Sequence, residues 1–138
     1  VPLLSTPVIV CGAPSLVGKG DVNLASLPWI KDSSFGSDLF RRILGRAGCD
    51  PDAVTIVDPG AARFEIDFAL RGFGLSVGPE LVHRRHLAEG TLVRLDVSLG
   101  VAAVYYAIVR SGELPASVRL LFDWLQDVCA DQSGPLDA

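Results

Sequence analysis

The chain has 138 residues, of which 49% are hydrophobic and 20% charged, and its formal net charge is −4. A chain of this length buries roughly 68% of its unfolded surface, so it can form one α/β domain with a real core. The negative charge argues against direct nucleic-acid binding by this segment. No apolar run approaches the roughly 20 residues of a membrane-spanning helix.

The three cysteines are too scattered along the chain for a disulfide framework or a zinc site. We therefore expect reduced thiols in a cytoplasmic protein that needs no metal and no cofactor and does not contact a membrane. The sequence contains no methionine, even at position 1, which suggests a piece of a longer polypeptide.

The first half of the chain predicts three strands and a helix. Pro7–Cys11 is a β-branched strand, and the Gly/Pro/Ser-rich stretch Gly12–Asp21 is a loop. Leu27–Ile30 is a short extended piece. A helix over Asp38–Ala47 has apolar residues at helical spacing and ends at a glycine. Ala53–Val57 is the next strand.

The middle of the chain alternates helices and strands. A helix follows the Pro59-Gly60 turn and ends at Gly72, although residues 63–68 alternate in polarity as a strand would. We prefer the helix because two alanines before this segment and Ala-Leu after it extend it. Phe73–Val77 is an apolar strand suited to burial on both faces. Pro79 can open a helix that ends at Gly90, and a further strand follows it.

The last third predicts a buried strand over Val101–Val109 and a helix opened by Pro115, with apolar residues at helical spacing. Strands that alternate with helices indicate a mostly parallel sheet. Such sheets bind small molecules where their strands end.

Two motifs suggest chemistry that the sequence does not support. Gly12–Gly20 follows a strand and contains Gly-Lys, as a phosphate loop does. However, five residues separate Gly12 from Gly18 instead of four, and Gly20 stands where a Ser or Thr would hold magnesium. We expect a solvated surface loop. His83 and His86 lie three apart without a third metal ligand nearby, so we expect a charged, solvent-facing segment.

No residue pattern demands catalysis. Cys11 closes an apolar strand and is expected to behave as a small hydrophobic residue. No serine stands in a Gly-x-Ser-x-Gly elbow. The sequence therefore favours a protein that is not an enzyme.

The better candidates for binding are three turns that carry a strand into a helix. The first, Ser33, Ser34 and Phe35, offers hydroxyls, free amides and a ring. The second contains Asp58, Gly60 and Ala61, where helix amides would meet an anion or the carboxylate a cation. The third contains Gly78 and Pro79. The alternative is that Ser34, Ser37 and Asp58 only cap helices.

With these elements in place, the chain resembles the effector-binding domain of LysR-type transcriptional regulators, in particular the branch with the glycine-cleavage activator and the β-lactamase regulator. Five segments carry the resemblance in order: Leu4–Val10 (LSTPVIV), Val22–Ile30 (VNLASLPWI), Ala69–Pro79 (ALRGFGLSVGP), Leu87–Val93 (LAEGTLV), and Tyr105-Tyr106 with Pro115–Leu125 (PASVRLLFDWL).

The resemblance implies an α/β fold of the periplasmic-binding-protein-like (type II) class, a three-layer sandwich with one subdomain complete and the other only partly present. Residues 1–11 would form the crossover strand, 12–98 the second effector-binding subdomain, and 99–138 the returning strand and C-terminal helix of the first. The three turns would then line the second subdomain's side of a cleft that holds the ligand.

The implied function is small-molecule effector sensing and oligomerisation in a bacterial LysR-type transcription regulator. The implied partners are the effector and a second copy of the chain. DNA would be reached only through an N-terminal winged helix-turn-helix that this sequence lacks. Left alone, the apolar strand and helix of the last third would be exposed. A stand-alone solute-binding module of the same fold is the main alternative, and an α/β enzyme fragment is the third.

Overall fold

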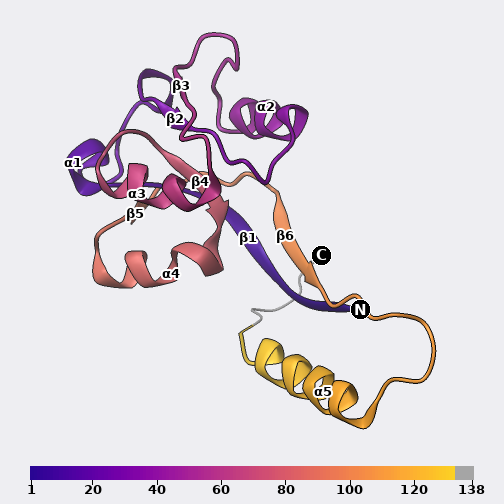
Figure 1. Cartoon of the computed structure of the whole chain (residues 1–138). Coiled ribbons are helices and arrows are strands. Elements are labelled where there is room, and N and C mark those ends of the chain that lie inside the picture. The colour runs from indigo at the N-terminus through magenta and orange to yellow at the C-terminus, as the bar shows by residue number, and fades with distance from the viewer. Residues whose placement is uncertain (133–138) are drawn as a thin grey trace. The chain divides into compact units, whose positions relative to one another are not determined.

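The computed structural model describes residues 1–132 and divides the chain into two compact units. The larger unit contains Val8–Val101, and the smaller unit combines Val1–Pro7 with Ala102–Ala138. Figure 1 shows the elements of both units in the colour order of the chain. The two segments of the smaller unit are far apart in sequence and meet through strand pairing.

The first strand, β1 (Pro2–Gly12), contributes to both units. In the larger unit it pairs antiparallel with β4 (Ser76–Pro79) and β5 (Val93–Arg94). In the smaller unit it pairs antiparallel with β6 (Ala102–Tyr106). The predicted N-terminal strand is confirmed and extends further toward the N-terminus, because its pairing with β6 satisfies the backbone there.

A second, parallel set of strands lies in the larger unit. β2 (Trp29–Ile30) pairs parallel with β3 (Ile56–Val57), and Trp29 also forms a parallel bridge with Leu75, just before β4. These three segments are joined through helices, which is the connection that parallel pairing requires. The expectation of a mostly parallel sheet is wrong for β1, whose pairings are all antiparallel. The reason is that no simple strand–helix–strand connection joins β1 to the strands it pairs with.

The three predicted helices of the larger unit are present as α2 (Ser37–Arg46), α3 (Glu65–Leu70, preceded by the 3-10 turn η2, Ala62–Phe64) and α4 (Glu80–Glu89). The unit also contains the short helix α1 (Pro14–Val17) and the 3-10 turn η1 (Leu24–Ser26), which were not predicted. The helical interpretation of residues 63–68 is confirmed by η2 and α3. Gly72 and Gly90 follow helices with φ of 76° and 75°, the left-handed conformation that a glycine adopts without strain.

Two expectations about the larger unit are wrong in detail. The segment Gly12–Asp21 is not a plain solvated loop, since it contains α1, and the α1 residue Val17 is buried in the core. The strand predicted at Phe73–Val77 begins at Ser76 after the bridge at Leu75, and Phe73 is 50% exposed. Phe73 packs edge-on against the Phe68 ring instead of entering the sheet.

The hydrophobic core lies entirely in the larger unit, as far as the structure describes the chain. One cluster joins Cys11, Ile30, Ala69 and Leu92, so that β1, β2, α3 and the approach to β5 pack together.

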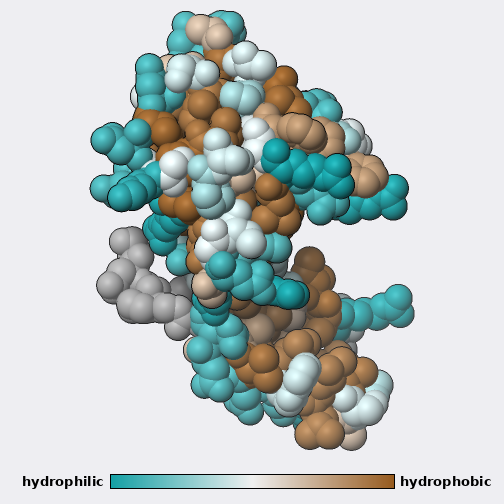
Figure 2. Space-filling model, turned by 90° about the vertical axis from the view of Figure 1, so that its left-hand side faces the viewer, coloured by the Kyte–Doolittle hydropathy of each residue, from teal (hydrophilic) through white to brown (hydrophobic). Residues whose placement is uncertain are grey.

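The smaller unit is held together differently. The buried strand predicted over Val101–Val109 is only Ala102–Tyr106 long, and Val104, Tyr105 and Tyr106 are exposed. The final helix, α5 (Ala116–Ala130), has no buried residue. Hydrophobic residues gather over α5 in the lowest part of Figure 2. The apolar strand and helix lack the neighbours that would cover them within residues 1–132.

The helices of residues 1–132 include none with the length and apolar character needed to cross a membrane.

Candidate functional site

In the larger unit, β2, β3 and the segment that leads into β4 run parallel and end at the same edge of the sheet. Trp29 N donates to Thr55 O at 2.8 Å and Lys31 N donates to Val57 O at 2.9 Å, while Ile30 N donates to Leu75 O at 2.8 Å. β2 therefore lies between β3 and the segment that leads into β4. The three predicted turns follow these strands, so they leave from the same edge.

Asp32 organises the first turn. Its Oδ1 accepts a hydrogen bond from Ser34 N at 2.7 Å and a short one from Ser34 Oγ. Phe35 N donates to Asp32 O at 3.3 Å. The Asp32 side chain is therefore the acceptor of an Asx turn, and only 8% of the residue is exposed. Ser33 and Ser34 are exposed and Phe35 is half-buried.

The amides of this turn are not free, contrary to the sequence-based expectation. Ser33 N donates to Glu65 Oε1 at 2.8 Å, across from α3. The amides of Ser34 and Phe35 are taken by the side chain and the carbonyl of Asp32. The helix-capping alternative is also wrong here, because the N-cap of α2 is Gly36, and no side chain caps that helix.

The second turn faces the first through a loose ion pair. Asp58 Oδ1 accepts a hydrogen bond from Gly60 N at 2.9 Å, and Asp58 Oδ2 lies 4.0 Å from Lys31 Nζ. Both side chains are largely exposed, so the pair contributes at most about 1 kcal/mol. Gly60 has φ of 79°, which suits this turn. Asp58 does not cap a helix, since the N-cap of η2 is Ala61.

The third predicted turn is not a separate turn, because Gly78 and Pro79 are the last two residues of β4, pair with β1, and are followed directly by α4. This strand end, which keeps the name third turn, lies against the first turn. Gly78 is buried and Pro79 half-buried. A Cβ on Gly78 would lie 3.7 Å from Asp32 Oδ2 and 2.8 Å from Cε1 of His83. Only a glycine leaves room at this point for the His83 ring, with the Asp32 carboxylate next to it.

His83 is buried rather than solvent-facing, so the expectation for the His83–His86 segment is wrong at this residue. Its Nδ1 lies 2.9 Å from Pro79 O and its Nε2 lies 2.9 Å from Ser76 Oγ. Since a carbonyl only accepts, Nδ1 carries the proton of that hydrogen bond. The ring thereby ties the start of α4 to β4.

Cys11 is buried in the core and pairs with Ser76, the residue whose hydroxyl contacts His83. Burial raises the pKa of the Cys11 thiol to about 12, and a hydrogen bond with Ser76 offsets part of that effect. The thiol is therefore neutral and poorly nucleophilic, as expected of a small hydrophobic residue. No disulfide forms among the cysteines of residues 1–132.

Sequence reasoning found the three turns but missed the side chains that connect them. Lys31 links the first turn to the second, Glu65 links it to α3, and Asp32 adjoins the third. The Asp-Ser-Ser pattern at Asp32 is a recognisable Asx-turn signal. Residues 1–132 contain no group of three or more His, Cys, Asp or Glu side chains arranged to hold a metal ion.

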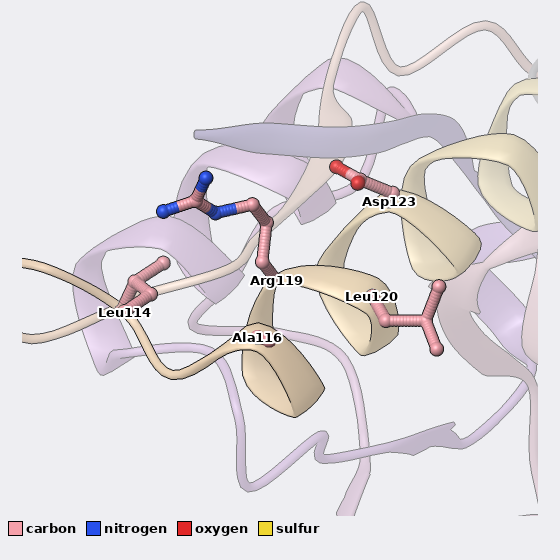
Figure 3. A pocket seen from close by; sticks show the side chains of 5 residues that line it. All are labelled: Leu114, Ala116, Arg119, Leu120 and Asp123. Atoms are coloured by element: carbon pink, nitrogen blue, oxygen red, sulfur yellow. The ribbon is translucent and has the colours of Figure 1, made fainter.

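A separate hollow of about 330 Å³ lies in the smaller unit, at the start of α5. Figure 3 shows Arg119 and Asp123 projecting from one side of the helix and Leu120 from another. Leu114 and Ala116 complete the lining. No polar group that lines the hollow is buried, so it lacks the fixed polar contacts of a specific site.

The sequence matches the LysR substrate binding domain family over residues 1–130. No curated protein sequence matches the chain significantly. Among solved structures, the effector domain of the transcriptional regulator AmpR of Pseudomonas aeruginosa is 16% identical, with a TM-score of 0.74 over 96% of this chain and 65% of that one.

Two further structures are similar. The CcmR regulatory domain of Synechocystis PCC6803, in complex with 2-PG, is 19% identical with a TM-score of 0.71, over 97% of this chain and 68% of that one. Full-length LysG of Corynebacterium glutamicum, with bound effector Arg, is 18% identical with a TM-score of 0.64, over 95% and 46%. This chain thus spans about two thirds of the length of the isolated regulatory domains.

The fold and the shared strand-end edge define an α/β protein of the periplasmic-binding-protein-like type II class, of which the chain represents a part. The chain belongs to the LysR substrate binding domain family. The resemblance drawn from the five sequence segments is confirmed.

Proposed function

We propose that this chain is the effector-sensing part of a bacterial LysR-type transcription regulator, and that the three turns of the larger unit bind a small molecule. The observation that carries the proposal is the convergence of the turns at Ser33–Phe35, Asp58–Ala61 and Gly78–Pro79 on one edge. Open α/β sheets bind ligands at this kind of edge. The chain would sense its ligand rather than convert it.

The similar proteins support sensing without fixing the ligand. LysG was solved with bound effector Arg and CcmR in complex with 2-PG, so two regulators of this fold carry different small molecules. At 18% and 19% identity, neither ligand transfers to this chain. The local chemistry of the edge has to define the effector.

The family also suggests how the chain is divided into subdomains and which macromolecules it contacts. We propose that residues 12–98 form the second effector-binding subdomain and that residues 99–138 belong to the first, with residues 1–11 as the crossover strand. The chain would self-associate in the cytoplasm. It would act on DNA only through an N-terminal winged helix-turn-helix, whose arrangement effector binding would bias.

A ligand screen with a blocking variant tests the effector site. A small-molecule panel is scanned for compounds that raise the midpoint of thermal unfolding, since a ligand stabilises the state it binds. The exposed Ser33→Trp change places an indole over the edge and is expected to abolish that stabilisation. Ser111→Trp, an exposed position in the smaller unit, is the matched control and keeps it. If Ser33→Trp retains full stabilisation, the site is wrongly placed.

Sequencing the coding DNA upstream of the Val1 codon tests the regulatory role. A winged helix-turn-helix followed by another α/β half in the same reading frame is the expected result. An export signal in that place would instead favour the solute-binding module.

A further inference from the structure

The Asp32 carboxylate combines deep burial with one uncommitted oxygen. The residue is 8% exposed, and its Oδ1 is fully used by the amide and hydroxyl of Ser34. Within residues 1–132, no group donates a hydrogen bond to Oδ2 and no cation forms an ion pair with it. A carboxylate withdrawn from water in this way gains free energy from any donor or cation that reaches the open oxygen.

The open oxygen points to the shared edge. Every fully buried side-chain polar atom of the described residues has a hydrogen-bond partner, so Oδ2, which has none, must reach solvent. It lies next to Gly78, where a Cβ would be 3.7 Å away. Oδ2 therefore has an exposed surface between the first and third turns, next to Gly78 and the His83 ring.

The neighbouring titratable groups have other partners than Asp32. His83 is the nearest titratable ring, but its Nδ1 is used by Pro79 O and its Nε2 by Ser76 Oγ. The ammonium of Lys31 lies 4.0 Å from Asp58, the carboxylate of the second turn.

The charge of the edge disfavours an anion. Asp32, Asp58 and Glu65 face a single cation, Lys31, among the groups that connect the turns. The turn amides that would bind an anion are already occupied, at Ser33 by Glu65 and at Gly60 by Asp58. At these two amides an anionic ligand would meet carboxylates that already hold the donors, whereas a cation would meet the uncommitted Oδ2 of Asp32.

We propose that Asp32 Oδ2 anchors a positively charged group of the effector, an ammonium or a guanidinium, at the edge between the first and third turns. This inference rests on the proposed function and adds the ligand's chemical class to it. Asp32 acts as the anion of a charge-assisted hydrogen bond, with its orientation held by Ser34.

The test uses methylguanidinium as the cationic probe and methylurea as a neutral probe of nearly the same shape. Each is titrated into the ¹⁵N-labelled chain at constant ionic strength while the backbone amide signals of Ser34 and Gly78 are followed. Methylguanidinium is expected to shift both signals saturably, with an affinity roughly tenfold or more above that of methylurea, because only the cation makes a charge-assisted bond. This comparison needs no variant.

The variant arm replaces the carboxylate without changing its shape. Asp32→Asn keeps an oxygen for the Ser34 amide and is expected to remove the preference for methylguanidinium. Asp52→Asn, at an exposed carboxylate paired with Arg41, is the matched control and should keep it.

The outcomes separate this inference from the proposed function. If acetate shifts the Ser34 and Gly78 signals and methylguanidinium does not, the cationic class is overturned while effector binding at the edge stands. If Asp32→Asn binds methylguanidinium as the unchanged chain does, Asp32 is not the anchor. If no probe shifts these signals, the inference fails, and the Ser33→Trp screen then decides on the proposed function by itself.

Discussion

At the scale of single residues, the clearest constraint is the absence of a side chain at position 78. Gly78→Ala would place a methyl group 2.8 Å from Cε1 of His83, a ring held by hydrogen bonds at both nitrogens. We expect overpacking to lower the free energy of unfolding by about 1–3 kcal/mol, measured by urea denaturation.

The matched control for this change is Gly45→Ala in α2. Nothing lies within 4 Å of the Cβ that this substitution adds, and its backbone is helical. Alanine favours the helix, so Gly45→Ala should raise the free energy of unfolding by about 0.5–1 kcal/mol. Equal effects of the two substitutions would contradict the packing described around His83.

The buried thiol makes a second residue-level prediction. The pKa of Cys11 is raised by burial from its ordinary value of 9.0 to about 12, so the folded thiol stays protonated at pH 9–10. Ionisation in that range occurs only in the unfolded chain and therefore favours unfolding, which removes stability as the pH rises above 9.0.

With iodoacetamide at pH 8 and mass spectrometry, we expect Cys11 to be modified only after unfolding, and the half-exposed Cys129 before it. Equal labelling rates in the folded chain would show that Cys11 is accessible.

At the scale of elements, one arginine connects α2 to the segment that closes the larger unit. Arg46 Nη1 donates to Leu99 O at 2.7 Å and to Gly100 O at 3.1 Å. Arg46→Ala should lower the free energy of unfolding by about 1–3 kcal/mol, because two carbonyls lose a charged donor. Arg42→Ala, an exposed position in the same helix, is the control and should change it by less than about 0.5 kcal/mol. If the two variants unfold at the same urea concentration, the hydrogen bonds of Arg46 do not contribute to the free energy of unfolding.

The elements that the sequence predicted well are those with local causes. Glycines with positive φ end helices at Gly72 and Gly90, and prolines precede α4 and α5. These residues therefore predicted where the helices begin and end. Strand direction and burial depend on distant partners. The antiparallel pairing of β1 and the exposure of Tyr106 could not be read from periodicity, since Val101–Val109 has the same apolar pattern whether or not a neighbour covers it.

The candidate site shows the same division. Turn chemistry and the order of strands and helices predicted the three turns. The Asp32 carboxylate, the Glu65 contact with Ser33 and the burial of His83 arise from segments that only the fold brings together. His83 lies in a charged segment, so its sequence context predicts exposure to solvent. Nothing in the sequence predicts that its ring packs closely against Gly78, five residues earlier.

At the scale of the whole molecule, the two units differ in how they bury apolar surface. The larger unit has a hydrophobic core, whereas α5 of the smaller unit leaves Leu120 72% exposed and Trp124 57% exposed. Related regulatory domains are about half again as long as this chain. Large apolar residues on the surface of a helix favour association, because burial of apolar area is favourable at roughly 25 cal/mol per Å².

We therefore expect the 138-residue chain to self-associate through α5. Leu121 and Trp124 lie one turn apart on the exposed helix face, so Trp124→Glu places a charge in the middle of the apolar surface. In light scattering across a concentration series, this variant should weaken association roughly tenfold or more, since buried tryptophans dominate such interfaces. Gln126→Glu adds the same charge two residues on, on the opposite side of the helix, and should leave association unchanged. A chain that is monomeric at every concentration, with or without Trp124, would show that the exposed face of α5 does not drive association.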